Sequence, residues 1–191
     1  MKYKNAIVRS VVIISILVLS VLCGLLFQLI WDHVDRVNYP REYSDYVDIY
    51  SYEYGVPEHV VYSVIKVESD FESGAVSEDG AVGLMQIMPD TFIWLTTENG
   101  EHLNSATLYD PKTNIKYGTY YLSKLYLQFG SWDEVFAAYN AGPDKVEEWL
   151  SDERYSEDGK ELSDIPFKET EKYVKKVNKA DNIYKKLYFE E

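Results

Sequence analysis

The chain has 191 residues, of which 32 are acidic and 19 basic, giving a formal net charge of −13. Every acidic residue follows Trp31, so the C-terminal part carries a large negative charge. Such a charge repels nucleic acid and anionic lipid surfaces, and it argues against a nucleic-acid partner. The single cysteine, Cys23, precedes Trp31. The C-terminal part therefore has no disulfide and must be held together by its own core.

The first long feature is an uncharged apolar segment from Val11 to Ile30. Twenty residues in a helix span about 30 Å, the thickness of the hydrocarbon core of a bilayer. A cleaved signal peptide is the alternative. Its apolar core, however, has only roughly 7 to 15 residues and ends at a small-residue cleavage site, which this segment lacks. We therefore predict a transmembrane helix at 11–31.

Basic residues flank this helix on its N-terminal side, where Lys2, Lys4 and Arg9 stand, whereas Asp32 and Asp35 follow it. The positive-inside tendency places such a basic flank in the cytoplasm. The sequence thus predicts a cytoplasmic segment at 1–10 and a single-pass anchor in the cell membrane. A linker at 32–42 and an extracytoplasmic domain at 43–191 follow.

Helical periodicity dominates the predicted domain. Apolar residues recur at helical spacing, and glycine, proline or polar residues mark the ends of most segments. The glycine-rich stretch 72–83 interrupts this pattern and predicts a loop or a small hairpin. We expect a single, mainly helical domain with helices near 43–54, 57–68, 89–97, 110–129, 131–140, 146–150 and 168–187.

Three of the expected helix ends carry capping signals. Asp110 before Pro111 is typical of an N-cap followed by the first helical turn. Ser131 stands three residues before Glu134, which is the spacing of a capping box. Asn140 stands where its helix is expected to stop, and it is suited to the left-handed conformation of a C-cap.

A carboxylate lies on the apolar face of the predicted helix 57–68. Val60, Val61, Val64, Ile65 and Glu68 recur at helical spacing, so Glu68 ends an apolar stripe. Burial and the negative end of the helix dipole both disfavour the charged carboxylate. Both would raise its pKa towards that of a general acid. The spacing leaves one alternative open, a helix-terminal glutamate that reaches back to solvent.

Two further segments carry candidate site residues. In "GAVGLMQIMP", Gly83 allows a close backbone approach, Gln86 offers an amide, and Met88 offers an apolar wall. Core packing is the ordinary alternative for the methionines, whereas a glutamine between apolar neighbours needs polar partners. In "AAYNAGP", Tyr139 and Asn140 stand at a helix end, where side chains can face a cleft.

Four motifs in one order resemble a known family. They are "VES" at 67–69, "GAVGLMQIMP" at 80–89, "AAYNAGP" at 137–143 and "PFKETEKYVKKV" at 166–177. Together they resemble the catalytic domain of the soluble lytic transglycosylases, glycoside hydrolase family 23, which is related to goose-type lysozyme. The resemblance covers roughly residues 43–177. It departs after Phe71, where the family has asparagine or aspartate followed by proline and this chain has Glu72 and Ser73.

The resemblance implies a mainly helical fold of the lysozyme-like α+β type. It also implies cleavage of the β-1,4 bond between N-acetylmuramic acid and N-acetylglucosamine in peptidoglycan. Glu68 matches the single catalytic acid of the family. Six residues match positions that line the cleft or close it, and Asn140 joins them as a candidate substrate-binding residue because of its place at a helix end. The six are Ser77, Gln86, Met88, Tyr139, Glu169 and Tyr173.

With a single acid, the charge that develops at the anomeric carbon must be met by the substrate's own 2-acetamido group, as in substrate-assisted glycosidases. Glu68 would act first as acid and then as base, with Tyr139 and Ser77 orienting the groups, and the product would be a 1,6-anhydro sugar. Glu72 and Glu78 are the nearest other carboxylates in sequence, and we expect neither to be a nucleophile. The alternatives are hydrolysis by a muramidase on the same fold and a non-catalytic wall-binding scaffold.

No cofactor and no metal are expected, because His33, His59 and His102 lack the spacing of metal ligands. The expected partners are the glycan strands of peptidoglycan and, through the N-terminal helix, the membrane. We expect the protein to be a monomer.

Overall fold

The structure, a computed structural model, describes residues 2–190, with side chains from residue 11 onward. It divides into two compact units between Pro40 and Arg41, and each is described by itself. The first unit is built on helix α1 (Lys2–Asn38), whose apolar side chains are exposed from Val11 onward. This helix is long and apolar enough to cross a membrane. The stretch 32–38, which we assigned to a linker, is helical.

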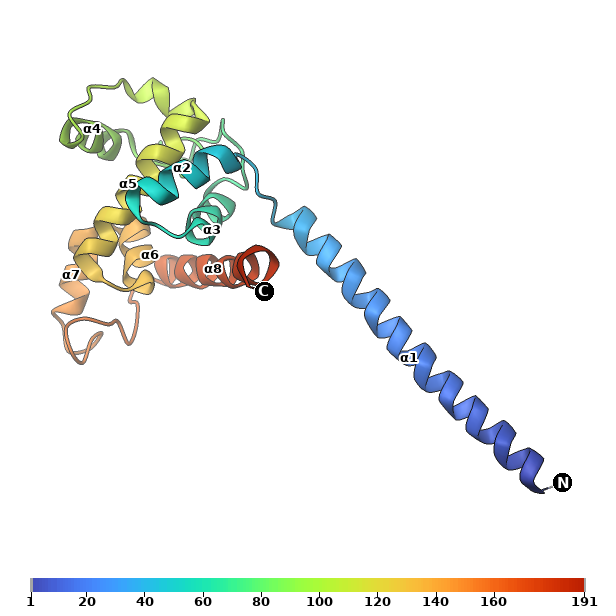
Figure 1. Cartoon of the computed structure of the whole chain (residues 1–191). Helices are drawn as coiled ribbons and strands as arrows, with labels where there is room; N and C mark the ends of the chain where they lie inside the picture. Colours follow the sequence, from blue (N-terminus) through green and yellow to red (C-terminus); the bar gives the residue numbers. More distant parts are fainter. Residues whose placement is uncertain (1, 191) are drawn as a thin grey trace. The chain divides into compact units, whose positions relative to one another are not determined.

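The second unit is mainly helical, as the sequence predicted (Figure 1). Every predicted helix is present within a few residues of its expected bounds, and a short 3-10 helix and a final π-helical turn add to them. In chain order the elements are α2 (Ser44–Tyr54), α3 (Glu58–Glu68), α4 (Pro89–Glu98), η1 (Ser105–Tyr109), α5 (Pro111–Phe129), α6 (Trp132–Ala141), α7 (Pro143–Leu150), α8 (Lys168–Tyr184) and η2 (Lys185–Phe189).

The core of this unit joins helices that are distant in sequence. Tyr62 of α3 stacks on Tyr184 of α8 with ring centroids 5.4 Å apart, and Phe92 of α4 meets Tyr117 of α5 edge-to-face at 5.1 Å. All four rings are fully buried. Burying a large apolar side chain contributes about 1.5 to 3 kcal/mol. The α3–α8 interface is the most extensive of these contacts, and it brings the end of α3 beside the start of α8.

The glycine-rich segment between α3 and α4 is a loop. Within residues 2–190 it forms no strand, and its pairing is limited to isolated antiparallel bridges from Val82 to Val76 and to Ile87. Asp70 and Phe71, directly after α3, take left-handed conformations with φ of 51° and 67°. Non-glycine residues rarely adopt this region, so the sharp turn after α3 is held by its surroundings.

One predicted cap is confirmed and one is wrong. Asp110 Oδ2 accepts a hydrogen bond from the Thr113 amide at 2.9 Å, as an N-cap does. Ser131 occupies the N-cap position of α6, but its side chain makes no capping hydrogen bond. Glu134, its expected partner, is buried and accepts the amide of Leu162 at 2.9 Å. The capping box fails because Glu134 fastens a later loop instead.

The end of α6 also differs from the prediction. The helix runs through Asn140 to Ala141, and Gly142 forms the cap with φ of 91°. Asn140 is therefore helical, which excludes the alternative of a left-handed C-cap at this residue. Because glycine supplies the turn, the Asn140 side chain bonds to another helix, α8, as described below.

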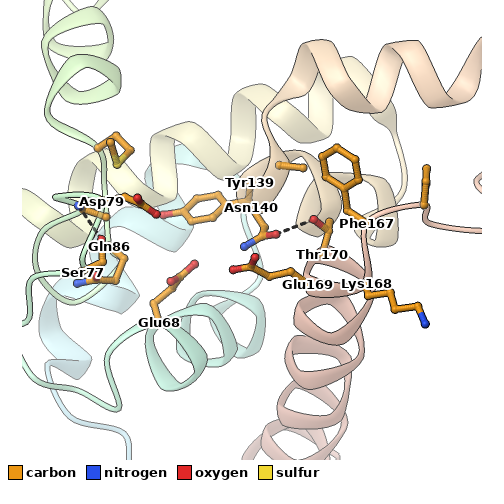
Figure 2. Close-up of a pocket in the computed structure, with 14 residues that line it drawn as sticks. Glu68, Ser77, Asp79, Gln86, Tyr139, Asn140, Phe167, Lys168, Glu169 and Thr170 are labelled. Carbon is orange, nitrogen blue, oxygen red and sulfur yellow. Dashed lines mark hydrogen bonds between the residues drawn. The ribbon is translucent and has the colours of Figure 1, made fainter.

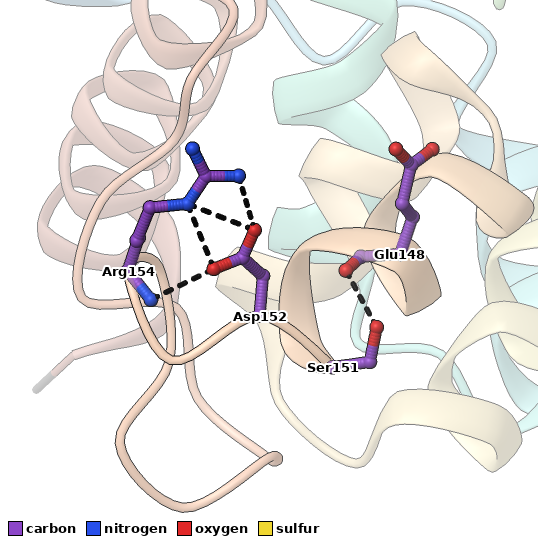
Figure 3. Close-up of polar contacts among 4 residues, drawn as sticks. All are labelled: Glu148, Ser151, Asp152 and Arg154. Atoms are coloured by element: carbon purple, nitrogen blue, oxygen red, sulfur yellow. Dashed lines mark hydrogen bonds and ion pairs between the residues drawn. The ribbon is translucent and has the colours of Figure 1, made fainter.

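The segment between α7 and α8 is shaped near its start by local polar contacts (Figure 3). Ser151 Oγ donates to the Glu148 carbonyl at 2.8 Å. Arg154 donates through Nε to both carboxylate oxygens of Asp152, each at 3.0 Å, and its backbone amide donates to the same carboxylate. Exposed pairs of this kind add little stability, but they fix the course of the chain. The segment ends at Phe167, where α8 begins.

Candidate active site

A cleft of about 760 Å³ opens at the C-terminal end of α3 (Figure 2). Four parts of the chain meet there: the end of α3, the glycine-rich loop, the end of α6 and the start of α8. Seven of the eight predicted site residues line it, and the eighth, Tyr173, bonds to one of the seven. The seven are Glu68, Ser77, Gln86, Met88, Tyr139, Asn140 and Glu169.

Glu68 is the last residue of α3, and its half-buried side chain is directed towards Tyr139 and Asn140 (Figure 2). Burial raises the pKa of Glu68 to about 7, against a smaller lowering effect of the hydrogen bond from Tyr173. No charged neighbour contributes to this shift. The prediction of a raised pKa is thus confirmed, and near neutral pH this carboxyl is divided between its protonated and ionised forms.

Two phenols stand beside Glu68. Tyr173 of α8 donates its hydroxyl to Glu68 Oε1 at 2.6 Å. Tyr139 of α6 donates its hydroxyl to the Met85 carbonyl at 2.8 Å. Burial, and then the negative charge of Glu68, hold the pKa of both phenols well above the ordinary value. Both therefore keep their protons and act as neutral donors, one towards the acid and one towards the loop that covers it.

Ser69 ties the end of α3 to this loop. Its hydroxyl donates to the Leu84 carbonyl at 2.8 Å, and its amide donates to the Ile65 carbonyl at 3.1 Å. The residue after the acid thus closes the last turn of α3 and anchors the returning chain. These two bonds fix the direction from which Glu68 faces the cleft.

The loop side of the cleft is rigidly built. Gln86 has φ of 46°, and its Nε2 donates to the carbonyls of Gly83 at 2.9 Å and Ala75 at 3.2 Å. The expectation that this amide needs polar partners is confirmed. Ser77 Oγ accepts the Ala81 amide at 3.0 Å and keeps its own proton as a possible donor to a ligand.

Asn114 of α5 fixes this loop through hydrogen bonds, and the sequence reasoning did not identify this residue. Its side chain is fully buried in α5; Oδ1 accepts the Met85 amide at 2.8 Å, and Nδ2 donates to the carbonyls of Val82 and Leu108 at 2.9 and 2.8 Å. A buried amide with all these partners replaces the strand pairing that the loop lacks. Its place on the apolar face of α5, beside Ile115, was the signal that could have revealed it.

Two glycines allow the loop and α5 to approach closely. A Cβ atom on Gly83 would lie 2.2 Å from Asn114 Nδ2 and 2.6 Å from the Leu108 carbonyl oxygen. A Cβ atom on Gly118, one turn after Asn114, would lie 2.3 Å from Met85 Sδ. Such distances are too short for a real side chain. Gly83, which also has φ of 82° and would meet a backbone oxygen, therefore requires glycine, whereas a side chain at Gly118 would force the Met85 side chain to move. Met85 is accordingly a packing residue, whereas Met88 is 41% exposed at the cleft.

The far wall of the cleft comes from α6 and α8. Thr170 Oγ1 donates to Asn140 Oδ1 at 2.8 Å, which joins the two helices, and the exposed carboxylate of Glu169 stands beside them (Figure 2). The sequence reasoning did not identify Thr170 or several other lining residues, since nothing in their local pattern distinguishes them. These are Asp79, Ala81, Ala141, Pro166, Phe167 and Lys168.

The other carboxylates near the cleft are more exposed to solvent than Glu68. Glu72 and Glu78, which we expected not to serve as nucleophiles, are exposed and are absent from the residues that line the cleft. Asp79 and Glu169 do line it, and both are exposed. Among the described residues, no group of three or more histidine, cysteine, aspartate or glutamate side chains is placed to hold a metal ion.

Comparisons with known proteins point to one family. Residues 45–162 match the family model for the transglycosylase SLT domain. The chain is 36% identical over 162 residues to the soluble lytic murein transglycosylase of Escherichia coli. It is 28% identical over 196 residues to membrane-bound lytic murein transglycosylase C of Edwardsiella ictaluri. These alignments cover 82% and 88% of this chain, but only 25% and 53% of the two relatives.

The fold agrees with a solved structure. The crystal structure of the 70 kDa soluble lytic transglycosylase of Escherichia coli superimposes with a TM-score of 0.73 at 33% sequence identity. The match covers 84% of this chain and 26% of that one. The chain thus corresponds to about a quarter of the larger protein.

Proposed function

Because the chain belongs to the transglycosylase SLT domain family, we propose that it is a peptidoglycan lytic transglycosylase. The bond cleaved is the β-1,4 link between N-acetylmuramic acid and N-acetylglucosamine. One observation carries the proposal: Glu68 lies in a cleft with a pKa of about 7, and no cation among the described residues lowers that pKa. A carboxyl in that state can give a proton to a leaving oxygen at neutral pH and then take one back.

In the first step Glu68 donates its proton to the bridging oxygen, and the bond from this oxygen to the anomeric carbon of the muramic residue breaks. The carbonyl oxygen of the muramic 2-acetamido group bonds to the anomeric carbon from the other face. This oxazolinium intermediate takes the place of a covalent glycosyl-enzyme. Asp79 and Glu169 are exposed at the rim of the cleft, so we assign neither as a nucleophile.

In the second step the Glu68 carboxylate removes the proton of the C6 hydroxyl in the same muramic residue. The oxygen at C6 then bonds to the anomeric carbon as the acetamido oxygen leaves. The product is a 1,6-anhydro sugar, Glu68 is protonated again, and no water is consumed. Tyr173, which donates to Glu68, supports the carboxylate form between the two steps.

The remaining predicted residues bind and orient the strand. Tyr139 keeps its proton and stands beside Glu68, where a phenol can direct the acetamido group. Ser77 and Gln86 face the cleft from the rigid loop, and Asn140 and Glu169 face it from the opposite wall. Met88 supplies an apolar surface for the face of a sugar ring.

We further propose that α1 anchors the enzyme in the cell membrane with the N-terminus in the cytoplasm. Support comes from the length and apolar composition of α1, and from the basic flank formed by Lys2, Lys4 and Arg9. In this orientation the acidic domain faces the cell wall, where its substrate lies.

Product analysis tests the proposal. The full-length chain, purified in detergent, is incubated with isolated peptidoglycan, and the soluble fragments are identified by mass spectrometry. Fragments with 1,6-anhydro ends are expected from the wild type and none from Glu68→Gln. Reducing ends would instead assign a muramidase. An intact wall with both proteins would assign the wall-binding scaffold, and in either case the transglycosylase proposal fails.

A further inference from the structure

The side of α8 that faces solvent is basic, although the chain after Trp31 is strongly acidic. Three of the 19 basic residues, Lys2, Lys4 and Arg9, precede Trp31, which leaves 16 against 32 acidic residues in the rest of the chain. Seven of these 16 are lysines within residues 168–186, where only three acidic residues stand among them. Positive charge gathered on one surface of an acidic protein indicates a binding surface for an anion.

Five of these lysines form one face of α8, which we call the lysine face. The helix buries Tyr173, Val177 and Tyr184 on its opposite side. Residues that are four, seven, eight and eleven positions after the first return to the same side of a helix, and eleven positions span roughly 17 Å. Every member of the lysine face is exposed; its members are Lys168, Lys172, Lys175, Lys176 and Lys179.

Four ammonium groups of the lysine face form no ion pair with any residue that the structure describes, whereas Lys175 is paired with Glu171 one turn earlier. The hydrogen bond from Lys175, and then the charges of Lys168 and Lys172, hold the pKa of Glu171 below its ordinary value. Glu171 thus offsets one of five positive charges. The lysine face keeps an excess of positive charge that is available to a partner.

The shape of the lysine face selects among anionic partners. It is a single row, and the chain around it is acidic. A flat anionic membrane or a nucleic-acid duplex would bring many negative charges against the acidic surroundings, which repel them. A thin, flexible chain with one negative charge in each repeat can follow the row and avoid those surroundings. Because lysines alone make up the face, it offers no aromatic ring on which the bases of single-stranded nucleic acid could stack.

The row begins beside the cleft. Lys168 lines the edge of the cleft, and its side chain points away from Glu68 (Figure 2). A polymer on the lysine face would therefore lie next to a glycan strand in the cleft without competing for Glu68. Stem peptides also carry carboxylates, but as short branches, whereas the row suits the successive charges of one continuous chain.

We propose that the lysine face of α8 binds a linear phosphodiester polymer of the cell wall, with successive phosphates at successive turns of the helix. Phosphate oxygens accept charge-assisted hydrogen bonds from ammonium groups. The assignment to a wall polymer rests on the proposed function, which places this unit at the wall, whereas the positive row itself does not depend on cleavage at Glu68. Binding would hold the enzyme on walls that carry such a polymer and favour cleavage there.

Binding of poly(glycerol phosphate) to the full-length Glu68→Gln protein tests the proposal. The protein is held in nanodiscs of neutral lipid, the polymer carries a fluorescent label, and fluorescence anisotropy gives the affinity at a series of salt concentrations. The affinity should fall as the salt concentration rises, because bound lysines displace the counterions of the polymer. Lys172→Gln, Lys176→Gln and Lys179→Gln together should weaken binding roughly tenfold to a hundredfold at low salt and make the salt dependence shallower.

Two further variants separate the lysine face from net charge. Lys112→Gln, Lys145→Gln and Lys160→Gln together remove three charges from exposed lysines outside α8, and the affinity should change far less. Arginine at positions 172, 176 and 179 keeps the positive row and should retain the binding.

Cleavage distinguishes this proposal from the proposed function. In the protein that keeps Glu68, the three glutamines on α8 should leave the rate on peptidoglycan stripped of phosphate polymer unchanged, which also shows that the variant is folded. They should lower the rate several-fold on walls that retain the polymer. If the wild type released no anhydro fragments from stripped peptidoglycan, the proposed function would fail, and the anisotropy titration would still decide whether the lysine face binds the polymer.

Three results would overturn the proposal. The first is the absence of polymer binding at low salt. The second is an equal loss of affinity in the α8 variant and in the variant with three glutamines outside α8. The third is tighter binding, per negative charge, of free stem peptides, of oligothymidylate or of nanodiscs containing phosphatidylglycerol than of the polymer.

Discussion

The interface between α3 and α8 contains a carboxylate near each of its ends, and the two are held in opposite ways. At one end, Asp181 of α8 bonds to His59 Nδ1 at 2.5 Å and to Lys185 Nζ at 2.6 Å. At the other end, the one hydrogen bond to Glu68 of α3 from the described side chains comes from the phenol of Tyr173. Burial disfavours the charge of both carboxylates.

The outcome depends on the partners. Burial alone would raise the pKa of Asp181, but the bonds from His59 and Lys185 hold it below its ordinary value. For Glu68 a neutral donor only partly offsets burial, and the pKa stays at about 7. The same helix pair thus holds a carboxylate that is charged near neutral pH at one end and a carboxyl that exchanges its proton near neutral pH at the other. Burial acts on both carboxylates. What distinguishes Glu68 in the candidate active site is that its hydrogen-bond partner is a neutral phenol and not a cation.

Neutralising each carboxylate in turn gives the largest expected difference. Glu68→Gln should reduce the rate of glycan cleavage about a thousandfold, because the amide can neither give nor take the proton. Asp181→Asn should stay within a few-fold of the wild-type rate, since this residue lies at the far end of the interface. Initial rates of anhydro-fragment release measure both. Comparable losses in the two variants would remove the functional contrast between the two ends.

The stability of Glu68→Gln and that of the wild type should diverge as the pH rises. The pKa of Glu68 is about 7 in the folded protein against an ordinary 4.5. The folded state therefore binds this proton more tightly than the unfolded chain, and the associated stability is complete below pH 4.5 and lost as the pH rises through 7. Glu68→Gln avoids this loss and should be more stable than wild type above pH 7, by a free energy of unfolding on the order of 3 kcal/mol.

Denaturant unfolding at a series of pH values, followed by the fluorescence of the C-terminal unit, measures this difference. The gap between the variant and the wild type should open from about pH 4.5 and level off above about pH 7. A gap that did not depend on pH would mean that Glu68 titrates as an ordinary exposed carboxylate, and the pKa assigned to it would be wrong.

Local pattern indicated the Glu68 end of this contrast, whereas the Asp181 end was not predicted. Helical spacing placed Glu68 on the apolar face of its helix, although the spacing alone left open a glutamate that reaches back to solvent. The amide of Gln86 between apolar neighbours indicated buried polar partners, which it has. Each signal lies within a few residues of the side chain that it concerns, so single-sequence reasoning could use it.

The remaining features depend on contacts across the fold. Asn114 bonds to Met85 and Val82, about thirty residues away in sequence. No local sequence pattern around Asn114 predicts those partners. Glu134 was expected to complete a local capping box with Ser131, but it serves Leu162. Both side chains form tertiary hydrogen bonds, which the periodicity of the sequence does not predict.

The paired end can be weakened separately. Asp181→Asn should lower the free energy of unfolding by about 2 kcal/mol near neutral pH, because a buried carboxylate that is bonded to His59 and to the Lys185 ammonium group is lost. Since the pKa of Asp181 is lowered by folding, its contribution is complete above the ordinary 3.8 and is lost as the pH falls through the lower folded value. The difference from wild type should therefore shrink in acid. Asp70→Asn, at an exposed pair with Lys66, should change stability by less than about 0.5 kcal/mol and serves as the control.

The smallest expected effect concerns the one donor at the other end. Tyr173→Phe removes the hydrogen bond that favours the charged form of Glu68, so the pKa of Glu68 should rise above 7 by about one unit. The acid must be protonated to act. The alkaline limb of the profile of kcat/KM against pH should therefore move to higher pH by the same amount. In Tyr139→Phe the lost phenol donates to Met85 rather than to Glu68, so this limb should keep its position. An unmoved limb in Tyr173→Phe would show that the titration seen in the rate belongs to another group, and Glu68 would lose its place as the acid that sets the pH dependence.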